Sequence, residues 1–209
     1  MLPNGLDERQ ARAAFFRNPA NSAGILEKLR PYFAEKKTRW ENIMIATAHD
    51  EPYRSFEGKT IAAASREAKK SPEEFLFEIL RDTGFETSAF NFSQNKKVVE
   101  RVLKQSYVAV GSDSIADGSR KPHPRAFGTF PKIMEDYVRD QKILSLGEEI
   151  RKMTSLPAKH FGIESRGQVR PGFFADLIVW DPETISASAT YENPKLLSRG
   201  IRWAFVNGR

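Results

Sequence analysis

The first ninety residues carry apolar side chains at the spacing of amphipathic helices. This spacing predicts helices over residues 7–17, 22–37 and 59–70. Pro31 lies inside the second of these and is expected to kink or split it. A fourth helix should begin after Ser71, because a serine followed by Pro72 and Glu74 has the capping-box pattern. Gly84 is placed to end that helix.

Short apolar runs lie between the predicted helices and indicate strands. Those over residues 42–47 and 108–110 are expected to be buried, and a further short strand is expected over residues 88–92. Further helices are predicted around residues 98–103, 131–140 and 145–153, the last with a capping box at Ser145. From Arg166 the pattern changes to strands and turns. Strand-forming residues occupy positions 174–180 and 200–206, and the second run ends in Asn207-Gly208, a strong hairpin-turn signal.

One stretch combines a predicted strand with reactive side chains. The apolar run Val108–Val110 ends in Gly111-Ser112-Asp113, and the turn His123-Pro124-Arg125 follows. A strand of a β/α barrel would deliver Asp113 from its carboxyl end to the face where barrel enzymes keep their chemistry. There a carboxylate can take a proton from water, and Arg125 can bind a substrate carboxylate bidentately. The alternative is a strand, a turn and an N-cap without chemistry, since Gly-Ser-Asp is common in turns.

These residues belong to a longer series of short motifs that follow one another in one order. The series is Gly111-Ser112-Asp113, His123-Pro124-Arg125, Gly128-Thr129-Phe130-Pro131, Lys152-Met153-Thr154-Ser155-Leu156-Pro157-Ala158, Arg166-Gly167 and Ala175-Asp176-Leu177-Ile178-Val179-Trp180-Asp181-Pro182. With it the chain resembles the C-terminal half of the N-acyl-D-amino-acid deacylases, the D-aminoacylase branch of the amidohydrolase superfamily. The resemblance implies an α/β fold: an incomplete (β/α) TIM-type barrel over residues 1–164 and a partial β-sandwich over residues 165–209.

The resemblance also implies a reaction, the metal-dependent hydrolysis of the N-acyl amide bond of an N-acyl-D-amino acid. Asp113 would be the catalytic residue that orients a zinc-bound water and moves its proton. Arg125 would hold the substrate carboxylate. His123, beside it, is expected to shape the loop or to contact the substrate. Asp113 could also ligate the metal, but only together with ligands that this chain lacks.

Most of the metal ligands of the resembled family are missing. Those enzymes begin with a His-x-His strand and add Cys and His ligands in the middle strands. This sequence has no cysteine, and its three histidines, His49, His123 and His160, are scattered. A catalytic zinc site takes about three protein ligands. We therefore expect that the chain binds no zinc stably by itself and is inactive without an N-terminal half, although His49, in a polar loop, is a candidate ligand.

Three other interpretations stay open at this stage. The chain could be a non-catalytic truncated paralogue or a binding subunit. It could also be a fragment of a hydrolase of cyclic amides, similar to dihydroorotase or hydantoinase. A companion N-terminal chain, or self-association through open sheet edges, could complete the fold in any of these cases.

Composition and charge limit the kinds of binding partner and the cellular location that can be expected. The chain has 209 residues and a net charge of +6, whereas a complete eight-stranded barrel typically needs ~250 residues. The basic residues alternate with acids on helix faces and form no block with stacking aromatics, so nucleic-acid binding is not expected. No apolar run approaches the ~20 residues of a membrane span. The absence of cysteine fits a reducing compartment, and the cytoplasm is the expected location.

Overall fold

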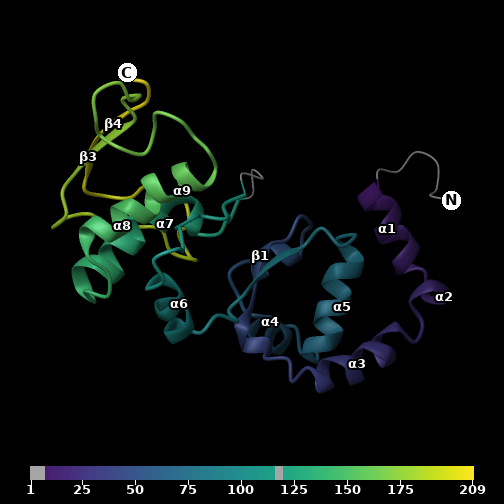
Figure 1. The fold of residues 1–209 in the computed structure, drawn as a ribbon. Coiled ribbons are helices and arrows are strands. Elements are labelled where there is room, and N and C mark those ends of the chain that lie inside the picture. Colours follow the sequence, from purple (N-terminus) through teal and green to yellow (C-terminus); the bar gives the residue numbers. More distant parts are fainter. Residues whose placement is uncertain (1–7, 116–119) are drawn as a thin grey trace. The chain divides into compact units, whose positions relative to one another are not determined.

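The structure is a computed structural model that describes residues 8–115 and 120–209. The chain divides into two compact units, residues 1–93 and residues 94–209, here called unit 1 and unit 2 (Figure 1). Each unit has its own helices and its own pair of strands. The two are therefore described separately.

Unit 1 packs helices around a short pair of strands. Its elements are α1 (Glu8–Arg17), α2 (Pro19–Ser22), α3 (Ile25–Glu35), β1 (Ile43–Thr47), α4 (Ile61–Glu67), α5 (Pro72–Asp82) and β2 (Ser88–Asn91), with 3-10 turns at Trp40–Asn42 and Tyr53–Phe56. The core is made of buried side chains from β1, the residue after it, α4 and α5: Ile45, Ala48, Ile61, Ala64, Phe75 and Ile79. Each large apolar side chain buried here contributes roughly 1.5–3 kcal/mol. The apolar spacing of the sequence thus marks the surfaces that pack together.

Helix boundaries in unit 1 follow the capping signals. Ser71 accepts a hydrogen bond from the Glu74 N–H, and the Glu74 carboxylate accepts one from the Ser71 N–H, which confirms the predicted capping box. Gly84 follows the end of α5 with φ +63°, and a Cβ there would lie 2.3 Å from the Arg9 carbonyl oxygen. Pro31 does not split α3, which is continuous around it. The helix predicted over residues 22–37 is α3, which begins only at Ile25 because Gly24 before it adopts φ +71°; the short helix α2 precedes that glycine.

The strand pairing in unit 1 differs from that of a β/α barrel. β1 and β2 are antiparallel, with Ile43 opposite Asn91 and Ile45 opposite Ala89. Neighbouring strands of such a barrel are parallel. Among the described residues, two separate two-stranded sheets are present and no closed barrel.

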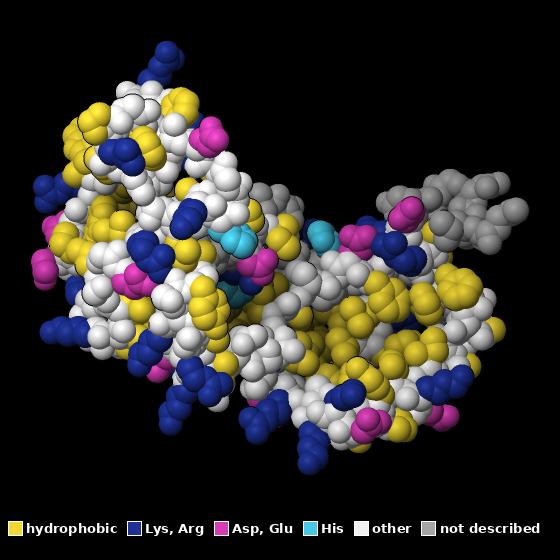
Figure 2. All heavy atoms as spheres, in the orientation of Figure 1, with side chains coloured by type: hydrophobic (Ala, Val, Ile, Leu, Met, Phe, Trp, Pro, Cys, Tyr) yellow, Lys and Arg dark blue, Asp and Glu magenta, His cyan; other side chains and the backbone are white. Residues whose placement is uncertain are grey.

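Unit 2 is mostly helical, with one strand pair near its C-terminal end. Its elements are α6 (Lys96–Leu103), α7 (Arg125–Ile133), the π-helical segment η3 (Met134–Asp140), α8 (Leu146–Met153), α9 (Ser155–His160), β3 (Leu177–Trp180) and β4 (Ile201–Phe205). Ser145 caps α8 by accepting a hydrogen bond from the Glu148 N–H, which is one half of the predicted capping box; the Glu148 carboxylate accepts from Arg151 instead. β3 and β4 are the two predicted C-terminal strands, and they pair antiparallel. Apolar side chains remain at the surface over this strand pair (Figure 2).

The prediction of a buried strand at residues 108–110 is wrong. This segment is irregular, with Val108 and Val110 half-buried and Ala109 exposed. The backbone of this segment bonds to helix α8 and not to a strand. Lys152 Nζ donates to the carbonyl oxygen of Gln105 and to that of Val108, the latter at 2.9 Å. The Val110 N–H donates to the Lys152 carbonyl oxygen at 3.1 Å. Side-chain and backbone groups of one helical residue thus satisfy the groups that a β-ladder would have paired.

Glu149, on the same helix as Lys152, is a buried charged residue. Glu149 is completely buried, and neither of its carboxylate oxygens has a hydrogen-bond partner among the described residues. Burial raises the pKa of Glu149, and the nearby Lys152 charge opposes that shift only in part. Burial therefore makes the charged form of this carboxyl group less favourable in the folded chain than in water.

Within the described ranges 8–115 and 120–209, none of the helices combines the length and apolar character that crossing a bilayer demands.

Candidate functional site

Asp113 and Arg125 lie together in unit 2. Arg125 Nη2 is 3.0 Å from Asp113 Oδ2. Asp113 does not stand at the end of a strand, as the sequence had predicted, but in an irregular segment with φ +48°. Arg125 is the first residue of α7 and not part of a loop. The predicted pair is thus close in space, although other local structures bring it together.

The two side chains differ in exposure. The Asp113 side chain is 85% exposed, whereas that of Arg125 is 35% exposed. Arg125 Nε is buried and has no hydrogen-bond partner among the described residues. A guanidinium group has five N–H donors, and the contact with Asp113 uses only part of them. Arg125 can therefore bind a second anionic group beside or instead of Asp113.

His123 is tied to Arg125 through the backbone. Its Nδ1 accepts a hydrogen bond from the Arg125 N–H at 3.0 Å, and its Nε2 lies 3.1 Å from the Tyr191 hydroxyl oxygen. Because Nδ1 accepts, we assign the proton of the neutral ring to Nε2, which then donates to Tyr191. Burial lowers the pKa of His123, and the Arg125 charge lowers it further against the opposing effect of Asp113. A neutral imidazole is therefore favoured beside the Asp113–Arg125 pair.

Tyr191 is a member of this cluster that the sequence did not reveal. It lies 68 residues beyond His123, and the two rings meet edge to face with centroids 5.2 Å apart. Burial raises the pKa of the Tyr191 phenol, so the hydroxyl stays protonated at neutral pH. The only local signal is a turn at Asn193-Pro194, which indicates a loop without naming a partner.

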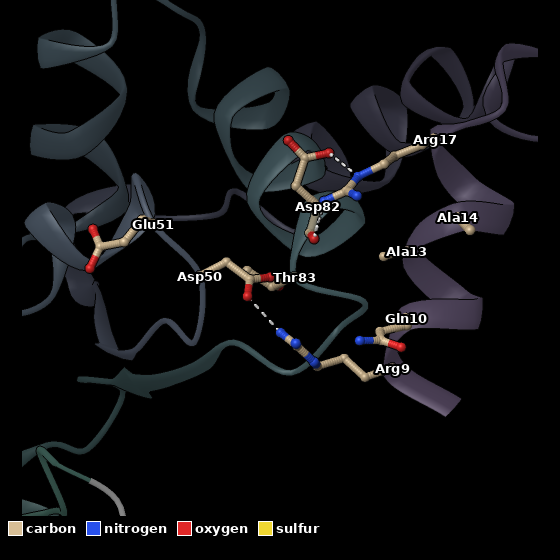
Figure 3. Close-up of a pocket in the computed structure, with 9 residues that line it drawn as sticks. All are labelled: Arg9, Gln10, Ala13, Ala14, Arg17, Asp50, Glu51, Asp82 and Thr83. Atoms are coloured by element: carbon tan, nitrogen blue, oxygen red, sulfur yellow. Dashed lines mark hydrogen bonds and ion pairs between the residues drawn. The ribbon is translucent and has the colours of Figure 1, made fainter. Parts of the chain in front are cut away.

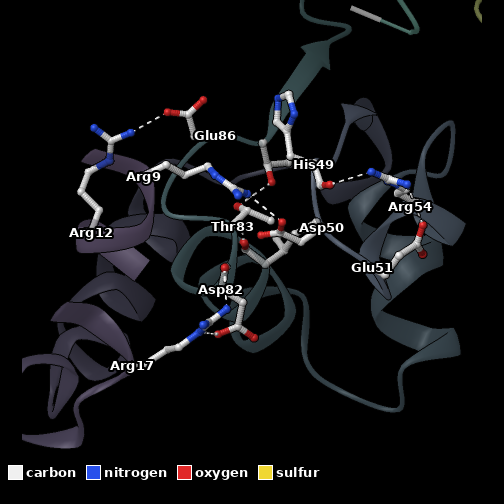
Figure 4. Close-up of polar contacts among 12 residues, drawn as sticks. Arg9, Arg12, Arg17, His49, Asp50, Glu51, Arg54, Asp82, Thr83 and Glu86 are labelled. Atoms are coloured by element: carbon white, nitrogen blue, oxygen red, sulfur yellow. Dashed lines mark hydrogen bonds and ion pairs between the residues drawn. The ribbon is translucent and has the colours of Figure 1, made fainter. Parts of the chain in front are cut away.

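A second polar group lies in unit 1, where the loop after β1 meets α1 and the end of α5. A cavity of about 440 Å³ opens here; its lining residues, all labelled in Figure 3, include Arg9, Arg17, Asp50 and Asp82. Arg9 pairs with Asp50 at 2.7 Å and Arg17 with Asp82 at 3.6 Å (Figure 4). The opposite charges in this cavity largely neutralise one another.

Tyr53, in the 3-10 turn Tyr53–Phe56 that follows β1, adds to this second polar group. Its hydroxyl donates to Asp82 Oδ2 at 2.7 Å. Burial and this hydrogen bond raise the pKa of Tyr53. Burial alone would raise the pKa of Asp82, but hydrogen bonds from Arg81 and Tyr53 outweigh it and hold that pKa below its usual range. This network orders the end of α5 and the loop after β1.

The three histidines do not meet in one site. His49 is exposed in unit 1, where its backbone oxygen accepts from Arg54 and its ring points away from the ion pairs (Figure 4). His160 is on α9 in unit 2 and its ring packs edge to face on Phe161. Across the described parts of the chain, no group of three or more His, Cys, Asp or Glu could hold a metal ion. The side chains present do not fit a catalytic metal centre.

The site and the fold define a class. A guanidinium, a carboxylate and a histidine ring of lowered pKa lie together on an α/β chain, and such groups can bind an anion and transfer a proton. The sequence pattern of the amidohydrolase family matches residues 5–209, and the chain belongs to this family.

Two curated relatives are similar to this chain. D-aminoacylase of Alcaligenes xylosoxydans xylosoxydans is 36% identical over 157 residues, which cover 75% of this chain and 31% of the relative. N-acyl-D-glutamate deacylase of the same organism is 38% identical over 120 residues, covering 57% of this chain and 24% of the relative. The chain thus spans about a third or less of the relatives that it matches. The resemblance read from the motifs is confirmed.

A solved structure agrees with the sequence relatives. N-acyl-D-glutamate deacylase from Bordetella bronchiseptica, in complex with zinc and a phosphonate inhibitor, superposes with a TM-score of 0.73 at 30% identity. The match covers 85% of this chain and 35% of that chain. The α/β fold of the chain is therefore similar to part of a deacylase.

Proposed function

We propose that this chain is the part of an N-acyl-D-amino-acid deacylase that supplies the proton-transfer carboxylate and the substrate-carboxylate anchor. The observation that carries the proposal is the pairing of Asp113 with Arg125, 3.0 Å apart in unit 2. The two residues come from motifs that the chain shares with the family. The relatives named for acting on N-acyl-D-amino acids support the choice of substrate.

The first step would be an exchange of partners at Arg125. A substrate carboxylate can accept two parallel hydrogen bonds from a guanidinium group, which is a stronger arrangement than a single contact. The present contact of Arg125 with the exposed Asp113 is an ion pair of the kind worth about 0–1 kcal/mol. Substrate binding can therefore replace it, and Asp113 becomes available for proton transfer.

Asp113 would then act as general base and general acid. It accepts a proton from the attacking water while the oxygen forms a bond to the acyl carbon. The same proton passes to the leaving nitrogen as the C–N bond breaks, which yields a carboxylic acid and a free D-amino acid. His123 and Tyr191 would hold the start of α7, and with it Arg125, through the hydrogen bond to the Arg125 N–H.

Zinc is part of the proposal only for a complete enzyme. The relative from Bordetella bronchiseptica contains zinc, but the described residues of this chain offer no group of metal ligands. Asp113 would ligate a metal only with ligands from outside this chain. The steps given above therefore use only the chain's own side chains.

The architecture of the complete enzyme belongs to the same proposal. Residues 1–164 would form the C-terminal part of a β/α barrel and residues 165–209 strands of a small β-sandwich. The similarity to part of a deacylase chain supports this assignment. A companion N-terminal polypeptide would supply the remaining strands.

The test is reconstitution. The chain is mixed, or co-expressed, with the N-terminal two thirds of the D-aminoacylase of Alcaligenes xylosoxydans xylosoxydans, and release of the free amino acid is measured. Neutral N-acetyl-D-amino acids and N-acetyl-D-glutamate are compared with their L enantiomers. Turnover of a D substrate that requires both polypeptides supports the proposal. Turnover of dihydroorotate but of no N-acyl-D-amino acid would favour a cyclic-amide hydrolase.

A second candidate is a binding subunit without turnover. The absence of a metal-ligand group from the described residues favours it. It predicts that N-acetyl-D-amino acids bind to the reconstituted pair, with loss of binding in Arg125→Ala, while no product forms. Calorimetry on the same mixtures separates this candidate from the deacylase.

A further inference from the structure

A second cavity, of about 400 Å³, lies in unit 2 between α9 and the loop that follows it. Its walls come from the end of α8, from α9 and from the loop as far as Phe173; the lining residues are Arg151, Ser155, Leu156, Ala158, Lys159, Ile163, Ser165, Arg166, Gln168, Arg170 and Phe173. Asp113, His123, Arg125 and Tyr191 are not among them. The volume falls within the range of ~300–1,000 Å³ typical of small-molecule sites.

The lining carries four basic side chains and no acidic one. Two of the four are neutralised from outside the cavity: Arg151 pairs with Glu148, and Arg166 with Asp176. Lys159 and Arg170 form no ion pair with any described carboxylate. The cavity therefore has two positive charges in excess, in contrast to the self-neutralised cavity of unit 1.

The loop is fixed closely against α9, so that the cavity has a defined wall. Gly167 has φ +79°, and a Cβ there would lie 2.9 Å from the Ala158 side chain and 3.0 Å from the Thr154 carbonyl oxygen. Arg170 lies over the Phe173 ring, 4.9 Å from its centroid, which restrains the guanidinium at the cavity wall. A side chain at position 167 would push this wall outward.

The other lining groups match an organic anion. Ser155, Ser165 and Gln168 offer hydrogen-bond donors, while Leu156, Ile163 and Phe173 offer apolar surface. Arginine and lysine side chains bind phosphate oxygens strongly because they are donors that carry full charge. A phosphate monoester carries about −1.5 to −2 charges at pH 7, which matches two uncompensated cations better than a single carboxylate does.

We propose that this cavity binds a small organic phosphate monoester, with Lys159 and Arg170 on the phosphate and the apolar residues against the organic group. The site is separate from the Asp113–Arg125 pair, and the proposal does not depend on the proposed function. It assigns a ligand class to a part of the chain that has no role in the hydrolytic steps described above.

The test uses the 209-residue chain and three probes: phenyl phosphate, inorganic phosphate and benzoate. Binding is measured by calorimetry at one fixed ionic strength, so that general screening is equal throughout. We expect saturable binding of one phenyl phosphate per chain, weaker binding of inorganic phosphate and still weaker binding of benzoate. Benzoate binding as tightly as phenyl phosphate would overturn the phosphate assignment, and the absence of saturable binding would overturn the site.

Matched variants locate the site. The double variant Lys159→Gln with Arg170→Gln should weaken phenyl phosphate binding by about tenfold or more, the scale for lost charged hydrogen bonds. The control, Lys97→Gln with Lys195→Gln, removes the same charge from exposed positions elsewhere in unit 2 and should change the affinity less than twofold. Equal effects of the two variants would show non-specific attraction and contradict the proposal. If the double variant does not fold, the single variants at exposed Lys159 and Arg170 decide by the same comparison.

Discussion

Arg125 Nη2 lies 3.0 Å from Asp113 Oδ2, and this contact joins the two residues that the hydrolytic proposal needs most. The pair is exposed on the aspartate side, so it contributes no more than about 0–1 kcal/mol to folding. Its importance would be in binding and proton transfer. A site of this kind should tolerate substitution without unfolding.

Lys152 should matter for folding instead. Its side chain is completely buried and donates to the carbonyl oxygens of Gln105 and Val108. Lys152→Met leaves both acceptors without this donor, and we expect a loss of about 2 kcal/mol in the free energy of unfolding. Urea unfolding is the measurement. Lys97→Met, on an exposed face of α6, is the control and should stay within about 0.5 kcal/mol; equal losses in the two variants would contradict the account.

We expect the stability of unit 1 to fall in acid, because Asp82 accepts a hydrogen bond from Tyr53. The pKa of Asp82 is below its usual range in the folded chain, so its contribution to stability is present above the unfolded-state pKa and is lost as the pH falls through the folded-state value. Tyr53→Phe removes one donor to Asp82 and should cost about 1 kcal/mol at pH 7 and less in acid. Amide hydrogen exchange in α5 reports it. Tyr32→Phe, at a half-exposed ring of the same unit, should leave exchange unchanged at every pH.

The chain should bind no stoichiometric zinc by itself. Asp113 and three separate histidines supply no closed set of ligands, and a catalytic zinc needs about three from protein. Metal analysis after incubation with zinc and dialysis is the check. About one zinc retained per chain would contradict this prediction.

Self-association is expected at high concentration. Among the described strands, β2 pairs only with β1, and the β3–β4 pair exposes Ile178 and Trp203 by 61% and 63%. Open edges and apolar strand faces favour pairing with another chain. The mean mass from light scattering should rise with concentration. Trp203→Lys should reduce the rise more than Tyr107→Lys, which changes an even more exposed ring outside the strands. A strictly monomeric chain would count against this expectation.

Local signals in the sequence predicted local structure well. The capping box at Ser71, the break at Gly84 and the strands β3 and β4 each depend on a few neighbouring residues, and all are present. The strand predicted at residues 108–110 failed for a long-range reason. An apolar run is compatible with a strand, but here Lys152 of α8 satisfies its backbone groups.

The sequence predicted only those residues of the candidate site that lie near one another along the chain. Asp113, His123 and Arg125 lie within a dozen residues and in recognisable motifs, so that the sequence could name them. Tyr191 reaches His123 only through the tertiary fold. The antiparallel pairing of β1 with β2 also depends on contacts between distant segments, which the apolar pattern does not encode.

The most direct test of the central claim is the activity of Asp113→Asn in the reconstituted enzyme. The substitution keeps the size and the exposed position of the side chain but removes the proton acceptor. We predict that kcat for an N-acetyl-D-amino acid falls by roughly 10²-fold or more, while unfolding stability and substrate binding change little. Arg125→Lys, measured in parallel, should act chiefly on KM. Full activity of Asp113→Asn in a reconstituted pair that turns over the substrate would contradict the proposed role of Asp113.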